Sequence, residues 1–151
     1  MSLIEELLKE EEGLFLQAYD DGTERVIRPG TTLKGHPTIG YGRALDVEGI
    51  TVDEALYLLR NDIAAVQAEA IKNFPWFSGL SEVRQAVILS MIFNLGLHGI
   101  SQFTSTIAAI EKGDFEAAST DMLTSKWATQ VGHRATELAG MMKTDTAPNL
   151  T

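Results

Sequence analysis

The chain has 151 residues, a hydrophobic content of 44%, a formal net charge of −9 and no Cys. This length suits one compact domain, the hydrophobic fraction excludes a chain that is disordered throughout, and the lack of Cys excludes disulfides and thiolate chemistry. The acidic balance argues against nucleic acid as a partner, because phosphate binding needs clustered Lys and Arg.

The first predicted element is a short amphipathic helix over residues 2–12. Ser2 followed by Glu5 is a capping box, and Gly13 is a natural C-terminal stop. The apolar stripe consists of Leu3, Ile4, Leu7 and Leu8. Positions 4, 8 and 12 share one face, so we expect Glu12 to continue the buried face at the negative end of the helix dipole. Both effects disfavour a charged carboxylate, as a general acid requires; the alternative is that Glu12 only ends a solvated acidic face.

A small β region is predicted from about residue 14 to residue 46. Asp21 follows an apolar run and precedes Gly22, which indicates a strand-to-turn junction where a carboxylate stays exposed and ionised. Glycines alternate with larger residues after Thr38, so a strand there would place Thr38 on a face otherwise free of side chains. An acid, an ionised carboxylate and a hydroxyl that can hold a water are the parts of an inverting glycoside hydrolase.

Two motifs in this region match one known family. Glu12, Gly13, Tyr19 and Asp21 fit a Glu-Gly-X5-Tyr-X-Asp pattern, and residues 38–42 fit Thr-Ile-Gly-X-Gly. The sequence thereby resembles the phage-type lysozymes, the T-even-like endolysin muramidases of glycoside hydrolase family 24. The resemblance implies an α+β, lysozyme-like fold, in which a long helix joins a small N-terminal β-hairpin lobe to a C-terminal helical lobe.

The resemblance also implies an activity and roles for three residues. The expected substrate is peptidoglycan, hydrolysed at the β-1,4 bond between N-acetylmuramic acid and N-acetylglucosamine, by inversion and without a cofactor. Glu12 would be the proton donor, while Asp21 and Thr38 would position the attacking water. Two alternatives stay open: a lytic transglycosylase, against which the presence of Asp21 and Thr38 argues, and a non-catalytic peptidoglycan-binding or phage structural protein.

The hairpin between the two motifs is longer than in the T-even enzymes. Its extra residues, about 26–36, either shape the rim of the cleft or only decorate it. Residues 22–43 contain four Lys or Arg and one Glu, so this stretch is basic in an acidic chain. We expect a positive rim that meets the anionic cell wall; the alternative is that these cations only solvate a flexible hairpin.

A connecting helix is predicted over about residues 51–73. Thr51 and Glu54 form a second capping box, and Asn73-Phe74-Pro75 ends the apolar stripe. The resemblance implies that Arg43 and Asp62 form an ion pair between the β lobe and this helix. The alternative is that these are two unrelated surface charges.

The helical lobe is predicted over about residues 76–146, packed with helix 2–12 in a single domain of residues 1–151. Residues 82–95 are apolar almost all round, as in the central helix of a bundle. Asn94 matches a family position that lines the substrate cleft, although an Asn near a helix end also often satisfies backbone groups.

A Lys-Trp-X-X-Gln-X-X-X-Arg spacing that begins at Lys126 also matches the family. It implies that Gln130 contacts sugar and that Arg134 is a structural or substrate-binding cation. We expect Trp127 in the core rather than as a platform for sugar, because Trp is mostly buried. Residues 147–151 are expected to form a frayed tail.

The start of the chain lacks the pattern of a signal peptide, and no segment is expected to insert stably into a membrane. We therefore expect a monomer that stays in the host cytoplasm until it is released to the periplasm. The resemblance implies that a holin opens the way. The three His residues, His36, His98 and His133, show no ligand spacing, so no metal site is expected.

Overall fold

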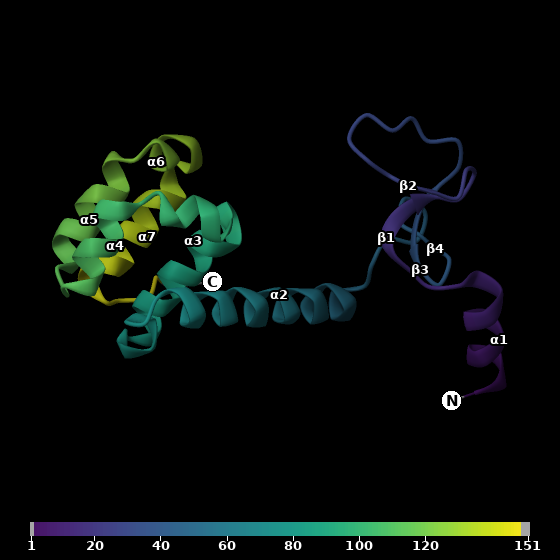
Figure 1. The fold of residues 1–151 in the computed structure, drawn as a ribbon, viewed down its shortest axis with the longest axis horizontal. Helices are drawn as coiled ribbons and strands as arrows, with labels where there is room; N and C mark the ends of the chain where they lie inside the picture. Colours follow the sequence, from purple (N-terminus) through teal and green to yellow (C-terminus); the bar gives the residue numbers. More distant parts are fainter. Residues whose placement is uncertain (1, 149–151) are drawn as a thin grey trace. The chain divides into compact units, whose positions relative to one another are not determined.

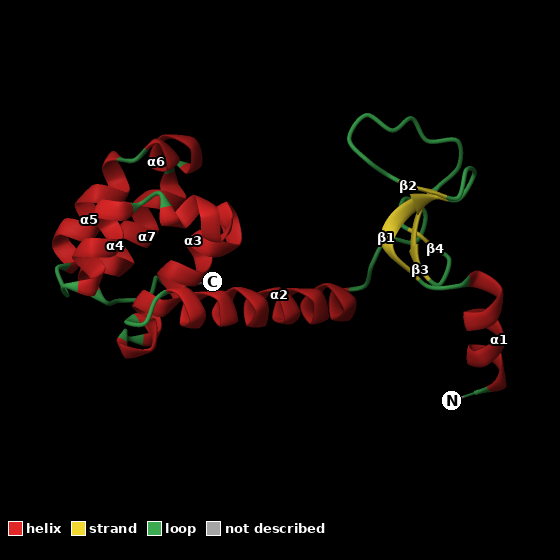
Figure 2. Ribbon diagram, viewed as in Figure 1, coloured by secondary structure: helices red, strands yellow, loops and turns green. Residues whose placement is uncertain are grey.

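The structure is a computed structural model that describes residues 2–148, so the tail predicted at 147–151 lies outside the described residues from residue 149 onward. The described residues form seven α-helices and four short strands, which confirms the predicted α+β fold class (Figure 1, Figure 2). The chain divides into two compact units, Met1–Tyr57 and Leu58–Thr151. The boundary between them falls inside one continuous helix, α2.

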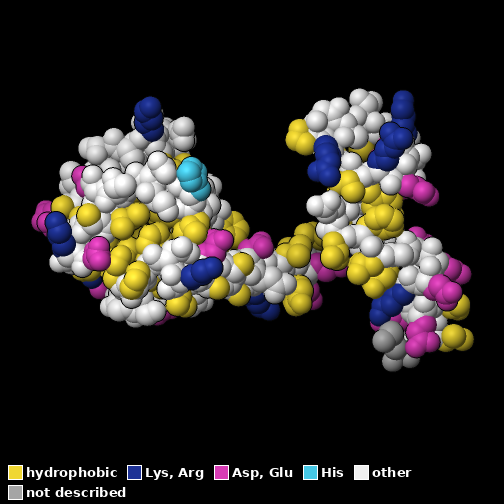
Figure 3. All heavy atoms as spheres, in the orientation of Figure 1, with side chains coloured by type: hydrophobic (Ala, Val, Ile, Leu, Met, Phe, Trp, Pro, Cys, Tyr) yellow, Lys and Arg dark blue, Asp and Glu magenta, His cyan; other side chains and the backbone are white. Residues whose placement is uncertain are grey.

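Helix α1, Leu3–Glu12, begins and ends where the sequence predicts. The Ser2 hydroxyl accepts a hydrogen bond of 3.4 Å from the Glu5 backbone N–H, and Gly13 follows the helix with a φ of 68°. Within the first unit no residue of α1 is buried and its Leu and Ile side chains are exposed, so the predicted burial of this stripe depends on packing with the helical lobe (Figure 3).

The side chain of Glu12 is likewise exposed within the first unit. Its predicted partial desolvation therefore also depends on packing of α1 with the helical lobe. Packing of α1 with the helical lobe stays a prediction.

The first unit contains one antiparallel sheet with the strand order β2-β1-β3-β4. The strands are β1, Phe15–Asp20; β2, Arg25–Val26; β3, Pro37–Gly40; and β4, Arg43–Ala44. Tyr19 is buried on the central strand β1, where it pairs with Val26 on one side and with Thr38 on the other. This register brings the end of β1, and Asp21 after it, beside the beginning of β3.

Helix α2, Val52–Asn73, is the connecting helix that the sequence predicts. The capping box is present in both directions. The Glu54 carboxylate accepts hydrogen bonds from the Thr51 backbone N–H at 2.7 Å and from its hydroxyl at 3.0 Å, while the Thr51 hydroxyl accepts one from the Glu54 N–H at 3.2 Å. The helix ends two residues before Pro75, because the residue before a proline is disfavoured in the helical region.

The second unit, Leu58–Thr151, contains the later part of α2 and further helices. These are the 3₁₀ helix η1, Phe77–Gly79; α3, Glu82–Ser101; α4, Thr104–Glu111; α5, Phe115–Thr124; α6, Lys126–Val131; and α7, His133–Thr144. Asp114 caps α5 through the Ala117 N–H at 3.0 Å, and Ser125 caps α6 through the Ala128 N–H at 3.2 Å. Helices α4 and α7 begin without a side-chain cap.

Helix α3 is the centre of this unit. It bends at Gly96, whose φ of 70° and ψ of 167° are not helical, so the apolar segment predicted over residues 82–95 ends there. By length and composition α3 could cross a membrane, contrary to the expectation that no segment would. Its apolar residues instead serve the core of the unit, because Ile88, Met91 and Ile100 are almost fully buried.

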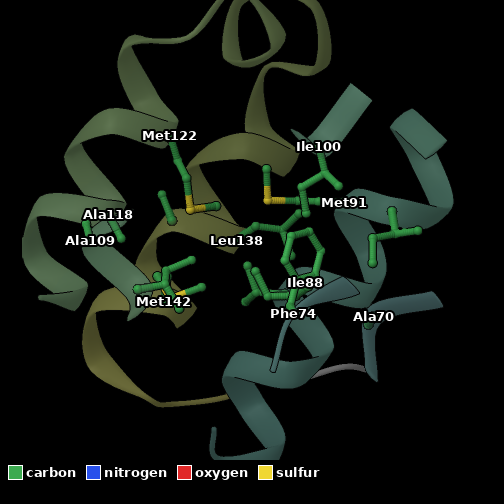
Figure 4. Packing of buried hydrophobic residues seen from close by; sticks show 14 of the residues in the cluster. Ala70, Phe74, Ile88, Met91, Ile100, Ala109, Ala118, Met122, Leu138 and Met142 are labelled. Atoms are coloured by element: carbon green, nitrogen blue, oxygen red, sulfur yellow. The ribbon is translucent and has the colours of Figure 1, made fainter. Parts of the chain in front are cut away.

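The core of the second unit is rich in methionine. Figure 4 shows Met91 of α3, Met122 of α5 and Met142 of α7 converging with Ile88 and Leu138. Methionine side chains fill irregular gaps between helices that cross at different angles. Each fully buried side chain of this size contributes about 1.5–3 kcal/mol by transfer from water.

Candidate active site

Glu12 is the last residue of α1 and lies beside the turn that joins β3 to β4. A Cβ atom at Gly42 would overlap the carboxylate and the Cγ of Glu12, so only glycine leaves this space open. Gly42 also has a φ of +77°, which L side chains rarely adopt. The sequence analysis used Gly42 only as part of a strand pattern, and its role beside Glu12 was missed.

Asp21 follows β1 and is exposed, as predicted. Its Oδ1 accepts a hydrogen bond of 2.6 Å from the backbone N–H of His36, and its own N–H donates to the carbonyl of His36 at 3.1 Å. A Cβ atom at Gly35 would overlap the same carboxylate oxygen. The backbone before β3 therefore fixes the direction of the Asp21 side chain.

Thr38 lies on β3 opposite Tyr19 and is only 2% exposed. Its hydroxyl donates a hydrogen bond of 3.1 Å to the carbonyl of His36. A hydroxyl that donates keeps its lone pairs as acceptors, so it can still receive a hydrogen bond from a water or a ligand. Asp21 and Thr38 thus share one backbone partner, His36.

Asp20, next to Asp21, is a buried carboxylate that the sequence analysis missed. It is 1% exposed and accepts four hydrogen bonds. The donors are the backbone N–H groups of Gly22 at 3.1 Å, Lys34 at 2.9 Å and Gly35 at 2.8 Å, and the hydroxyl of Thr23 at 3.2 Å. The hydrogen bond from Lys34 lowers the pKa of Asp20 most, and the other three donors lower it further although burial raises it.

The Asp20 carboxylate therefore closes the long hairpin at its base. The bond to the N–H of Gly22 is an Asx turn, for which an Asp two residues before a Gly is a typical signal. That signal would have identified the local half of the arrangement. The bonds to Lys34 and Gly35, fourteen and fifteen residues away, have no local signal.

The imidazole ring of His36 binds a further carboxylate in this region, that of Asp46. Its Nδ1 lies 3.0 Å and 3.2 Å from the two oxygens of Asp46, which follows β4. The hydrogen bond with Asp46 raises the pKa of His36, and the charges of Asp46 and Asp21 add to this effect. The sequence analysis considered His36 only as a metal ligand and did not identify this role.

Arg43 has an ion-pair partner within the first unit. The Arg43 Nη2 lies 3.0 Å from the carboxylate of Glu54, and its Nη1 donates to the carbonyl of Gly49 at 3.3 Å. Glu54 stands in the first turn of α2, close to β4 in the chain, whereas Asp62 belongs to the second unit. The predicted ion pair of Arg43 with Asp62, between the two units, stays a prediction.

The substrate-binding residues predicted in the helical unit have structural partners there. The Asn94 Oδ1 accepts a hydrogen bond of 3.0 Å from the indole N–H of Trp127, which confirms Trp127 as a core residue, 4% exposed. Arg134 donates to the hydroxyl of Ser90 at 3.0 Å and lines an apolar cavity of about 380 Å³ on this unit. Gln130 is exposed.

Glu12, Asp21 and Thr38 thus belong to the first unit, where His36 connects Asp21 with Thr38, while Asn94, Gln130 and Arg134 belong to the second. Sugar contacts by the latter three stay predictions. Among residues 2–148, no group of three or more His, Asp or Glu side chains has a geometry that could hold a metal ion.

Comparison with known proteins shows similarity over most of the chain. The sequence model described as phage lysozyme matches residues 9–146. The pre-baseplate central spike protein Gp5 of Enterobacteria phage T4 is 26% identical over 168 aligned residues, which cover 92% of this chain but 27% of that protein. "Probable T4-type lysozyme 1" of Dictyostelium discoideum is 26% identical over 165 residues, which cover 97% of this chain and 96% of that protein.

Proposed function

The chain belongs to the phage lysozyme family, and from this membership we propose that it hydrolyses the β-1,4 bond between N-acetylmuramic acid and N-acetylglucosamine in peptidoglycan. Family membership supports a lysozyme-like muramidase, a glycoside hydrolase, in general terms. The bond and the stereochemistry are our inference from three residues of the first unit, Glu12, Asp21 and Thr38.

Glu12 acts as the general acid in this proposal. Its exposed carboxyl group donates a proton to the glycosidic oxygen while the bond from that oxygen to the anomeric carbon breaks. A water held by Asp21 and Thr38 attacks the anomeric carbon from the opposite face and gives its proton to Asp21. The product then has the inverted configuration, as expected for a pair of carboxyl groups with a water between one of them and the sugar.

The observation that supports this proposal most is the shared partner of Asp21 and Thr38. The backbone carbonyl of His36 accepts a hydrogen bond of 3.1 Å from the Thr38 hydroxyl. The backbone N–H of His36 donates one of 2.6 Å to the Asp21 carboxylate. One peptide segment therefore fixes an acceptor of protons and a hydroxyl side by side. Fixed orientation of this kind is what activation of a single water needs.

The decisive experiment compares the parent with Glu12→Gln on purified peptidoglycan and on permeabilised Gram-negative cells. The substitution keeps shape and hydrogen bonding but removes the transferable proton, so we expect a loss of about 10²-fold or more in turnover with an unchanged melting temperature. Glu11→Gln, one position earlier on the same helix, is the matched control and should stay close to the parent. Equal losses in both variants would mean that Glu12 is not the acid.

The products separate the proposal from its rivals. Hydrolysis adds the mass of water and, by inversion, first gives the α-anomer at the new reducing end. A 1,6-anhydro end found by mass spectrometry would show a lytic transglycosylase instead. A parent protein that binds peptidoglycan but releases no fragments would show a binding or structural protein.

A further inference from the structure

His36 lies at the junction of the two residues proposed to hold the water. Its backbone makes three hydrogen bonds there: the N–H donates to Asp21 Oδ1 at 2.6 Å, and the carbonyl accepts from the Asp21 N–H and the Thr38 hydroxyl, each at 3.1 Å. The N–H and the carbonyl belong to the two peptide groups on either side of the His36 Cα, so a change in the backbone torsions of His36 would move the Asp21 and Thr38 side chains relative to each other. The orientation of this one residue therefore sets the geometry of the Asp21 and Thr38 pair.

The ring of His36 is fixed on the other side by Asp46. Nδ1 lies 3.0 Å from Oδ2 and 3.2 Å from Oδ1 of that carboxylate, so both oxygens share the ring N–H. Asp46 is itself held in place, because the neighbouring Leu45 N–H donates to the carbonyl of Pro37 at 2.7 Å. The turn after β4 and the beginning of β3 thus clamp His36 between them.

We propose that His36 is a positioning residue for peptidoglycan hydrolysis, in which the Asp46-bound imidazolium keeps the His36 backbone oriented so that Asp21 and Thr38 hold their water. This inference rests on the proposed function of the site. His36 does not contact the reacting atoms in this scheme; it acts through Asp21 and Thr38. It lies in the part of the hairpin for which the sequence analysis found no role.

The charges around the His36 ring determine how its ion pair with Asp46 depends on pH. The groups that act on His36 are Asp46, through its hydrogen bond and charge, and Asp21, through its charge; both are acidic and raise the pKa of the ring. A raised folded pKa means that the ion pair is complete below the ordinary value of about 6.5 and is lost as the pH rises through the folded value. Positioning should therefore weaken on the alkaline side.

The test is the pH profile of turnover for four variants on a soluble peptidoglycan fragment. Asp46→Asn should move the alkaline fall of kcat to lower pH, and His36→Gln should lower kcat by about tenfold at neutral pH and remove that fall. This loss is smaller than the roughly 10²-fold that a displacement of about 1 Å can cost, because the backbone bonds remain. KM should change less than twofold in both variants.

Two further variants serve as controls. Asp46→Glu keeps the negative charge and should restore much of the parental profile. Glu48→Gln removes an exposed charge from the same turn without a contact to the ring, and should match the parent. If Asp46→Asn and Glu48→Gln gave the same pH profile, His36 would have no positioning role.

A titration of the His36 ring by NMR distinguishes this inference from the function on which it rests. Asp46→Asn should lower the measured pKa of His36 whether or not the protein is active, and an unchanged value would overturn the inference. If the parent cleaved no peptidoglycan at any pH, the proposed function would fail and this inference with it. If the parent cleaved peptidoglycan and both substitutions at His36 and Asp46 left kcat unchanged, only this inference would fail.

Discussion

The carboxylate of Glu12 lies where a Cβ atom at Gly42 would be, so a side chain at Gly42 would collide with it. The contact joins the end of α1 to the turn between β3 and β4. It makes Gly42 part of the surroundings of the proposed acid, although glycine has no reactive group.

Replacement of Gly42 by Ala should therefore cost more activity than stability. The new Cβ would displace the Glu12 carboxylate, and the φ of +77° adds a backbone penalty of about 1–2 kcal/mol. Gly49→Ala is the matched control: its φ is +62°, but the nearest heavy atom to its Cβ is the Leu45 carbonyl oxygen at 3.9 Å. We expect similar melting temperatures and a large loss of turnover in Gly42→Ala alone. Equal activity of the two variants would show that the contact with Glu12 is idle.

Asp21→Ala and Thr38→Val should lower turnover far more than affinity, because both residues are proposed to act on the water. Thr38→Val also removes the hydrogen bond to His36, so its free energy of unfolding should fall by about 1 kcal/mol. Binding of a chitooligosaccharide, measured by calorimetry, is the control. Much weaker binding in both variants would make them substrate-holding residues and would contradict the assigned mechanism.

Asp20→Asn should lower stability in a way that depends on pH. The pKa of Asp20 is lowered in the folded protein, so its carboxylate stabilises the fold above the ordinary Asp value of about 3.9, and this contribution is lost as the pH falls through the lower folded value. The variant should melt below the parent at pH 7, and the difference should shrink towards pH 3. Glu10→Gln, an exposed change on α1, should follow the parent at every pH. A constant difference between Asp20→Asn and the parent would rule out the charge as the cause.

The hairpin of the first unit should supply a basic contact with the cell wall. Arg25, Arg28 and Lys34 are exposed, and Figure 3 shows basic side chains gathered over this hairpin. The Debye length falls from about 30 Å at 0.01 M salt to about 10 Å at 0.1 M, so moderate salt should first screen the repulsion between the acidic protein and the wall. Lysis of walls should thus rise and later decline with salt. Changing all three residues to Glu should slow lysis with little change in melting temperature.

A charge-matched control removes the effect of net charge from this comparison. Arg60, Lys72 and Lys112 are exposed residues outside the hairpin, and their joint change to Glu alters the net charge equally. If both triple variants lysed walls at the same rate across the salt range, the basic hairpin would have no special role.

Local patterns in the sequence predicted the ends of the elements well. The Ser2 cap, the reciprocal Thr51 and Glu54 box and the end of α2 before Pro75 all depend on residues within four positions of each other. Backbone donors at a helix start must be satisfied nearby, so such caps can be identified without knowledge of the fold.

The contacts that the sequence analysis missed join distant positions. Asp20 binds Lys34 and Gly35, and His36 binds Asp46, across a hairpin whose closure no local pattern fixes. Glu54 was missed as a partner of Arg43 for a related reason, since the sequence analysis considered Glu54 only as part of the capping box with Thr51. The position of Glu12 as the last residue of α1 could be predicted from the sequence. Its exposure could not, because burial depends on what packs against α1.

The hydrogen bonds of Asp20 at the base of the hairpin also identify a loop whose sequence and length can be engineered. Because one carboxylate ties Gly22 to Lys34 and Gly35, the loop tip at residues 28–33 can change in length without altering the bonds that hold Asp21. Doubling the length of a flexible loop costs only about 0.6 kcal/mol. Foreign peptides that recognise a chosen bacterial surface could be grafted at this tip, and Asp21, the proposed catalytic aspartate, would keep its place.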